Sequence, residues 1–162
     1  MSDCVISESK AGKYLTFSLA SEEYGIQILK VKEINGMMPI TSVPQVPNFV
    51  KGVINLRGKV IPVIDLRLKF GLEEIDYTER TCIIVVEIAS ESGTLLTGVI
   101  VDSVSEVISI KEEDIEDTPE FGAALDTAFI SGMAKKDSEI KILLDIDSVA
   151  GTTEIDTLAS AA

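Results

Sequence analysis

The sequence contains no histidine and no tryptophan, and only two of its 162 residues are cysteines. Histidine is the usual general base near neutral pH and the commonest metal ligand, so its absence excludes Ser-His-Asp and Cys-His catalysis and most zinc and iron sites. Cys4 and Cys82 are too few and too far apart for a metal knuckle. They are more typical of a tail thiol and a buried strand thiol in a reducing compartment than of a disulfide framework.

Positive charge is scarce as well. Fourteen Lys and Arg residues stand against 27 Asp and Glu, which gives a formal net charge of −13. Such a chain repels phosphate backbones and anionic lipid surfaces, so we expect no nucleic-acid partner. The N-terminus lacks the basic and apolar sections of a signal peptide, and no apolar run approaches the ~18 residues of a membrane span. We therefore expect a cytoplasmic protein without direct membrane insertion.

Apolar residues make up 46% of the chain, which is enough for a sizeable core in one domain or in two small units that share a core. Many of them alternate with polar residues, as Leu15, Phe17 and Leu19 do, and this period of two is typical of β-strands. The sequence predicts a mostly β fold with a few short helices. Strands are expected at 15–19, 24–28, 60–64, 82–88, 95–101, 104–110 and 140–144, with a turn at Asn35–Gly36 and an edge strand followed by a loop over 38–46.

The two halves of the chain resemble each other. At an offset of 73, Gly25-Ile26-Gln27-Ile28 aligns with Gly98-Val99-Ile100-Val101. At an offset of 80, Phe49-Val50-Lys51-Gly52 aligns with Phe129-Ile130-Ser131-Gly132. In both copies an Asp suited to cap a helix, Asp65 or Asp145, is followed six residues later by a Gly suited to end it.

Each copy alone would bury little surface and leave strand edges exposed. Two copies packed together would share a larger core and cover those edges. We therefore predict two pseudo-symmetric β-barrels around a shared hydrophobic core, in one domain spanning 12–151. The barrels would cover approximately 12–80 and 81–151, with strands exchanged between them or not. Flexible tails are expected at 1–11 and 152–162.

Catalytic motifs find little support. Residues 52–59 resemble a phosphate-binding loop, but five residues separate the two glycines and Val60 follows the lysine, so the Walker pattern fails. Asp145-Ile146-Asp147 resembles the start of a calcium loop without its later ligands and turn glycine, so a helix cap is the better interpretation. Acidic runs at 112–114 and 116–117 are more typical of a solvated face than of a hydrolytic pair. We expect no catalytic residues, no metal and no cofactor.

The remaining signals concern binding. The copies differ most where Asn55-Leu56-Arg57-Gly58-Lys59 stands against Lys135-Lys136-Asp137-Ser138-Glu139. Asn55 and Gly58 suit a tight turn, here between a helix and a strand. The planar guanidinium of Arg57 suits carboxylates or carbonyls of a partner, although an intramolecular salt bridge explains it nearly as well.

A second binding signal lies at residues 28–34. Ile28, Val31 and Ile34 recur every three residues, so a turn of helix here would place them on one side. They could belong to the shared core or to a groove. The equivalent residues near Val104 would add a second apolar wall, and such a cleft suits a partner helix.

At these residues the sequence resembles the CheW family of chemotaxis coupling proteins, from about residue 14 to about 149. The matching segments, in order, are Glu23-Tyr24-Gly25-Ile26, Ile28 to Ile34, Phe49-Val50-Lys51-Gly52-Val53, Asn55-Leu56-Arg57-Gly58 and Pro62-Val63-Ile64-Asp65-Leu66.

The resemblance implies two SH3-like five-stranded barrels and a non-enzymatic adaptor that couples methyl-accepting chemoreceptors to the histidine kinase CheA. The receptor's cytoplasmic tip would dock between the barrels, and the kinase's own CheW-like regulatory domain would bind elsewhere, at residues that we do not assign. By resemblance the receptor contacts are Val31, Glu33, Gly52 and Arg57, with Leu15, Ile28, Ile34 and Val104 as groove lining. The protein would then join membrane receptor arrays through protein contacts.

Two alternatives remain open at this point. One is a CheW-like decoy that binds the kinase and no receptor. The other, from a different class, is a small acidic metal-dependent hydrolase.

Overall fold

The computed structural model describes residues 11–90, 93–116, 129–136 and 138–150, and the predicted mostly β fold is confirmed. The expected tails lie outside these residues except for Ala11. The strands are β1 (Gly12–Leu19), β2 (Glu22–Gln27), β3 (Val31–Gly36), β4 (Val50–Leu56), β5 (Lys59–Asp65), β6 (Cys82–Ser90), β7 (Gly93–Val101), β8 (Ser103–Ile110), β9 (Ile115–Glu116), β10 (Ile130–Lys136) and β11 (Glu139–Leu144). The helical segments are η1 (Ile28–Lys30), α2 (Leu66–Lys69), η2 (Glu112–Asp114) and α3 (Ile146–Ala150).

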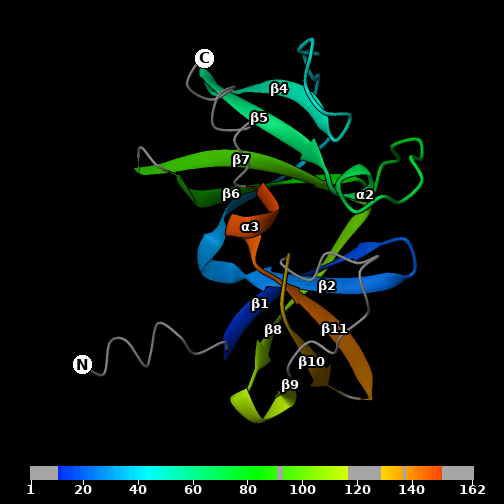
Figure 1. The fold of residues 1–162 in the computed structure, drawn as a ribbon, viewed down its shortest axis with the longest axis vertical. Helices are drawn as coiled ribbons and strands as arrows, with labels where there is room; N and C mark the ends of the chain where they lie inside the picture. The colour runs from blue at the N-terminus through cyan, green and yellow to red at the C-terminus, as the bar shows by residue number, and fades with distance from the viewer. Residues whose placement is uncertain (1–10, 91–92, 117–128, 137, 151–162) are drawn as a thin grey trace.

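The strands form two sheets, with α3 lying between them and α2 at one end of sheet B, beside β5 and β7 (Figure 1). Sheet A has the order β8-β1-β2-β11-β10-β9, and its sixth strand, β9, has two residues. Sheet B has the order β3-β6-β7-β5-β4. The two sheets fit the paired SH3-like architecture that the resemblance implies.

The two sequence copies exchange their first hairpins. Hairpin β1–β2 joins the late strands β8 to β11 in sheet A, and hairpin β6–β7 joins the early strands β3 to β5 in sheet B. The junctions are parallel pairs: β2 runs beside β11, and β5 beside β7. The division near residue 80 therefore follows the sequence repeat, whereas the sheets divide the chain between β2 and β3 and again between β7 and β8.

Local geometry repeats between the copies. The amide of Asp65 donates to the carbonyl of Phe49 at 2.8 Å, and the amide of Asp145 donates to the carbonyl of Phe129 at 2.9 Å. Both β4–β5 and β10–β11 contain a register shift just before the equivalent glycines, Gly52 and Gly132. Asp65 caps α2 by accepting from the Arg67 amide at 2.9 Å, as the sequence predicts.

The core lies in three layers. The largest cluster sits between the sheets and draws on both, for example Phe17 and Leu144 from sheet A and Ile84 and Val99 from sheet B. Strand β6 is buried on both faces. On one face Ile84, Val86 and Ile88 join this shared layer, and on the other Ile83 and Val85 join a second cluster inside sheet B. A smaller third cluster, around Tyr14 and Leu143, fills sheet A.

Three local predictions are wrong. The expected edge strand over 38–46 is reduced to an isolated bridge between Thr41 and Val53, because prolines interrupt the segment. The expected turn at Asn35–Gly36 is the end of β3, where both residues pair with β6. Cys82, expected to be buried, is partly exposed at the start of β6. None of the helices in the described ranges is long and apolar enough to cross a bilayer.

Candidate functional site

Arg57 lies at the tip of the β4–β5 hairpin. Leu56 pairs with Lys59, so Arg57 and Gly58 form a two-residue loop, and their φ angles are +52° and +89°. Two positive φ values are the signature of a type I′ turn, which matches the twist of the flanking strands. The Asn55 side-chain oxygen accepts from the Gly58 amide at 2.8 Å and holds the turn. The predicted tight turn therefore exists, but it joins two strands rather than a helix and a strand.

The guanidinium of Arg57 faces the carboxylate of Glu33 on β3. Arg57 Nη1 donates to Glu33 Oε1 at 3.2 Å, and Nη2 donates to Oε2. Asn35 Nδ2 donates to the same Oε1 at 3.1 Å. The Arg57 side chain is nevertheless 71% exposed. The intramolecular salt bridge of Arg57 is thus confirmed, and the side chain is exposed as well; contact with a partner stays a prediction.

The pair changes the acid–base behaviour of both groups. Hydrogen bonds from Arg57 and then from Asn35 lower the pKa of Glu33, and the bond to Glu33 raises the pKa of Arg57. Both groups are charged at neutral pH, so the site presents a fixed donor fork beside a carboxylate.

We expect the Glu33 carboxyl to titrate below its ordinary value of 4.5 in the native protein, because the charged form is the one that receives these bonds. In Arg57→Gln the midpoint should move upward, and in Asn35→Ala it should move upward by less, since Arg57 is the larger cause. Side-chain NMR titration of Glu33 measures this. An unchanged midpoint in Arg57→Gln would mean that the pair does not form in solution.

An apolar row lies along the same edge strand as Glu33. Ile28 belongs to η1, a single 3-10 turn, and the chain then becomes strand β3, so the helix expected over 28–34 is wrong beyond Lys30. In a regular strand, residues three apart point to opposite faces, but β3 has a bulge between Val31 and Glu33. As a result Val31 pairs with Val86 and Ile34 pairs with Ile84. Directly paired residues share a face, so Val31 and Ile34 both lie on the face of sheet B that carries the shared core.

The same bulge places Glu33 on the opposite face. Glu33 pairs with Val85, which belongs to the cluster inside sheet B. Strand β3 is the edge of sheet B and therefore offers an apolar face and a charged face along one exposed edge. Ile34 is 44% exposed, whereas Ile28 and Val31 are partly buried against the shared core.

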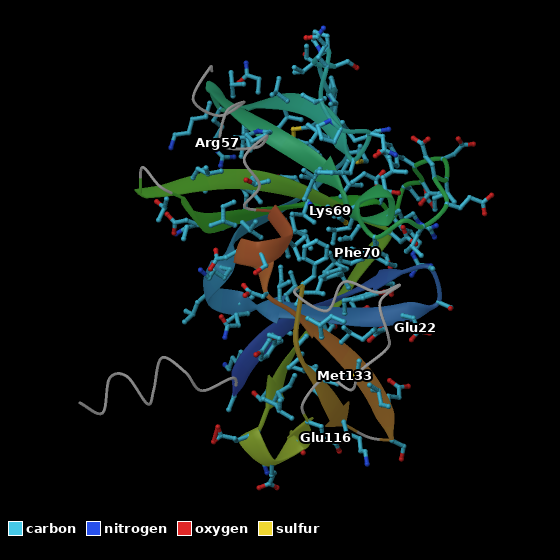
Figure 2. All side chains as sticks on the ribbon, in the orientation of Figure 1. Glu22, Arg57, Lys69, Phe70, Glu116 and Met133 are labelled. Atoms are coloured by element: carbon cyan, nitrogen blue, oxygen red, sulfur yellow. The ribbon has the colours of Figure 1, made fainter. Side chains whose placement is uncertain are left out.

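The second apolar wall lies on β8, the edge of sheet A. Val104 pairs with Phe17 and packs against the shared core, and Val107, one copy length after Ile34, is 49% exposed. The two walls are thus equivalent positions on edge strands of different sheets. Figure 2 shows Arg57 in the upper part of sheet B, whereas Lys69 and Phe70 lie between the sheets.

Two of the residues assigned by resemblance are buried. Leu15 is 2% exposed in the shared core. Gly52 is buried with φ +143°, and a Cβ there would lie 2.0 Å from the carbonyl oxygen of Thr41. Neither residue presents a side chain to a partner in this conformation, so their positions support the fold that carries the site.

Sequence reasoning missed a pocket of about 680 Å³ on sheet B, next to the Arg57 turn. It is lined by Lys32, Gly58, Lys59, Val60, Ile61, Pro62, Glu87, Thr94, Leu95 and Leu96. Val60 is 47% exposed, and its equivalent one copy later, Ile140, is 57% exposed. The sequence repeat could have pointed to this pocket, because it places an aliphatic residue, Val60 or Ile140, at the same position of both hairpins.

The acidic run at 112–114 forms η2, where the Asp114 carboxylate accepts from the Lys111 amide at 3.2 Å. Among the described residues, no group of three or more Cys, Asp and Glu side chains is placed to hold a metal ion. Asp117 lies outside those residues.

Comparison with known proteins agrees with the geometry. Residues 13–154 match the CheW-like domain family. The chain is 40% identical to the chemotaxis protein CheW of Klebsiella aerogenes over 148 residues, which cover 91% of this chain and 87% of that protein. It is 37% identical to the CheW of Bacillus subtilis over 145 residues, covering 88% and 90%. The crystal structure of the scaffolding protein TtCheW from Thermoanaerobacter tengcongensis superposes with a TM-score of 0.78 at 40% identity, covering 89% of this chain and 95% of that one.

Proposed function

The chain belongs to the CheW-like domain family, and from that membership we propose that it is a chemotaxis scaffold that couples methyl-accepting chemoreceptors to the histidine kinase CheA. The match spans nearly the whole chain, and the two-sheet fold is that of a solved scaffolding protein. A binding role also agrees with the chemistry of the site, which offers fixed charges and apolar edges.

The receptor-facing surface that we propose is the β3 edge together with the β4–β5 turn. The observation that carries this proposal is the accessible bidentate pair between Arg57 and Glu33, with the exposed Ile34 on the other face of the same edge strand. A guanidinium has five N–H donors, and two of them bond Glu33, so donors remain for a carboxylate or carbonyl of a partner helix. Val31, Ile28 and Val104 contribute apolar contact where they reach the surface.

A rigid double-sheet body can couple two partners mechanically. If receptor and kinase bind different faces, a change in receptor packing shifts the position of the kinase, and the two binding free energies become linked. The protein itself transfers no group in this scheme. It would sit at the receptor array through protein contacts.

Separate binding assays test the proposal. We expect the purified chain to bind CheA alone, to bind a receptor cytoplasmic fragment alone, and to bring the two into one complex, as measured by co-sedimentation with receptor-bearing vesicles. Binding to the kinase without binding to the receptor would identify the decoy alternative instead. A rise in the melting midpoint on adding Ca²⁺ or Mn²⁺ would favour the metal-dependent alternative.

A further inference from the structure

Within the described ranges the chain crosses between the sheets twice. It passes from β2 in sheet A through η1 to β3 in sheet B, and it returns from β7 in sheet B through Asp102 to β8 in sheet A. These are the places where the relative orientation of the sheets depends on a single segment. Each crossing carries a charged side chain, Lys30 or Asp102, that pairs with a distant helix.

At the second crossing, Asp102 binds α2 and a turn of sheet A together. Arg67 on α2 donates from Nε to Asp102 Oδ1 at 2.8 Å and from Nη2 to Oδ2 at 2.7 Å. The amide of Ala20, in the β1–β2 turn, donates to the same Oδ2 at 2.8 Å. Arg67 Nη1 also donates to the carbonyl of Glu73 at 2.9 Å. The helix that follows β5 of sheet B is therefore tied to a hairpin of sheet A.

At the first crossing, Lys30 and α3 make the equivalent arrangement. Lys30 Nζ donates to Asp147 Oδ2 at 2.9 Å, and the amide of Ala89 on β6 donates to Asp147 Oδ1 at 3.0 Å. Here the helix that follows β11 of sheet A is tied to a strand of sheet B. Figure 1 places α3 between the two sheets, against β6.

The two clusters lie at corresponding crossings, with their charges reversed and with Lys30 and Asp102 one residue out of register in the repeat. Asp147 stands 80 residues after Arg67, at the second position of the equivalent helix. In one cluster the cation is on the helix and the carboxylate on the crossing; in the other the carboxylate is on the helix and the cation on the crossing. In both, the carboxylate also accepts a hydrogen bond from a backbone amide in the first hairpin of the copy that carries the helix.

We propose that these clusters, Arg67–Asp102–Ala20 and Lys30–Asp147–Ala89, are a pair of charge-reversed latches that set and hold the relative orientation of the two sheets. The latches act on the fold itself, independently of any partner. They add directional bonds to a shared layer that is otherwise apolar, and apolar burial alone is non-directional.

The latches differ in strength. The Arg67–Asp102 latch is bidentate, and its side chains are 13% and 22% exposed, against 32% and 36% for Lys30 and Asp147. Burial raises the pKa of Asp102, but the bonds from Arg67 and Ala20 outweigh it, and the pKa lies below its ordinary value. We therefore expect the Lys30–Asp147 latch to open first, with the Arg67–Asp102 latch as the pivot.

The test uses the full chain and residual dipolar couplings, which report the relative orientation of the sheets in solution. Asp147→Arg should break the weaker latch, and the alignment tensors of sheets A and B should no longer agree with one fixed arrangement. Combining Lys30→Asp with Asp147→Arg gives this latch the polarity of the other one at unchanged net charge. The double variant should restore a common tensor.

Lys32→Asp is the matched control, because it breaks the ion pair with Glu87 between two strands of the same sheet. It should leave the tensors unchanged. If Asp147→Arg does not fold, Lys30→Met replaces it, since that change removes the cation and leaves the Asp147 bond to Ala89. A common tensor in the broken variant, or no recovery in the double variant, would overturn the proposal.

Discussion

Gly52→Ala is expected to give the largest loss of stability of any single methyl addition at a described glycine. The added Cβ would lie 2.0 Å from the Thr41 carbonyl oxygen and 2.7 Å from its carbon. Both are backbone atoms, and the bridge between Thr41 and Val53 fixes them. The φ of +143° adds strain that an L side chain rarely tolerates. We expect a loss above ~4 kcal/mol, a large part of the stability of a domain this size.

Gly12→Ala is the control for this prediction. Gly12 has the same φ of +143°, but nothing lies within 4 Å of its added Cβ. Strain alone costs about 1–3 kcal/mol. Chemical denaturation of both variants measures their free energies of unfolding and so separates the cost of backbone strain from the cost of the clash with Thr41. If Gly52→Ala costs no more than Gly12→Ala, the close approach to Thr41 does not exist in solution.

Arg57→Glu should weaken receptor binding by roughly thirtyfold or more while the fold is kept, since truncating one partner of a buried charge contact at an interface costs about 2–5 kcal/mol. The substitution places two carboxylates against each other and removes the guanidinium donors from the turn. Because the Arg57 side chain is 71% exposed, we expect circular dichroism and the melting midpoint to change little. Affinity for a receptor fragment is the measurement.

Two companion variants show what Arg57 does. Lys135→Glu makes the same charge change on the hairpin of the other copy, where the lysine is 65% exposed, and should leave receptor affinity unchanged. The exchange Arg57→Glu with Glu33→Arg rebuilds an internal pair but moves the guanidinium from the turn to β3. We expect it to leave binding weak. Full recovery in the exchange variant would mean that the salt bridge acts by shaping the turn, and not by contacting the receptor.

The alternation of apolar and polar residues predicted the mostly β architecture, and the sequence repeat predicted the paired sheets. It could not predict which hairpin belongs to which sheet. The patterns of the β1–β2 and β6–β7 segments predict strands but do not show which sheet each strand joins, and the parallel contacts β2–β11 and β5–β7 depend on packing between distant segments.

Site prediction succeeded where chemistry is local and failed where it depends on distant pairing. Asn55 and Gly58 predicted the tight turn correctly because a side-chain acceptor and a permissive φ act within four residues. Glu33 was named by resemblance, but its bond to Arg57 spans 24 residues and has no local signal. The period of three at Ile28, Val31 and Ile34 was misread as a helix because a bulge in β3 mimics it.

The most direct test of the central claim is reconstitution of CheA with receptor fragments on vesicles, with and without this chain, measuring kinase autophosphorylation. We expect the chain to raise receptor-dependent autophosphorylation by roughly tenfold, the scale of a coupling free energy between two sites, and Arg57→Glu to abolish most of that rise. If kinase activity is the same without the chain as with it, although the added chain binds both partners, the result would contradict the proposed coupling.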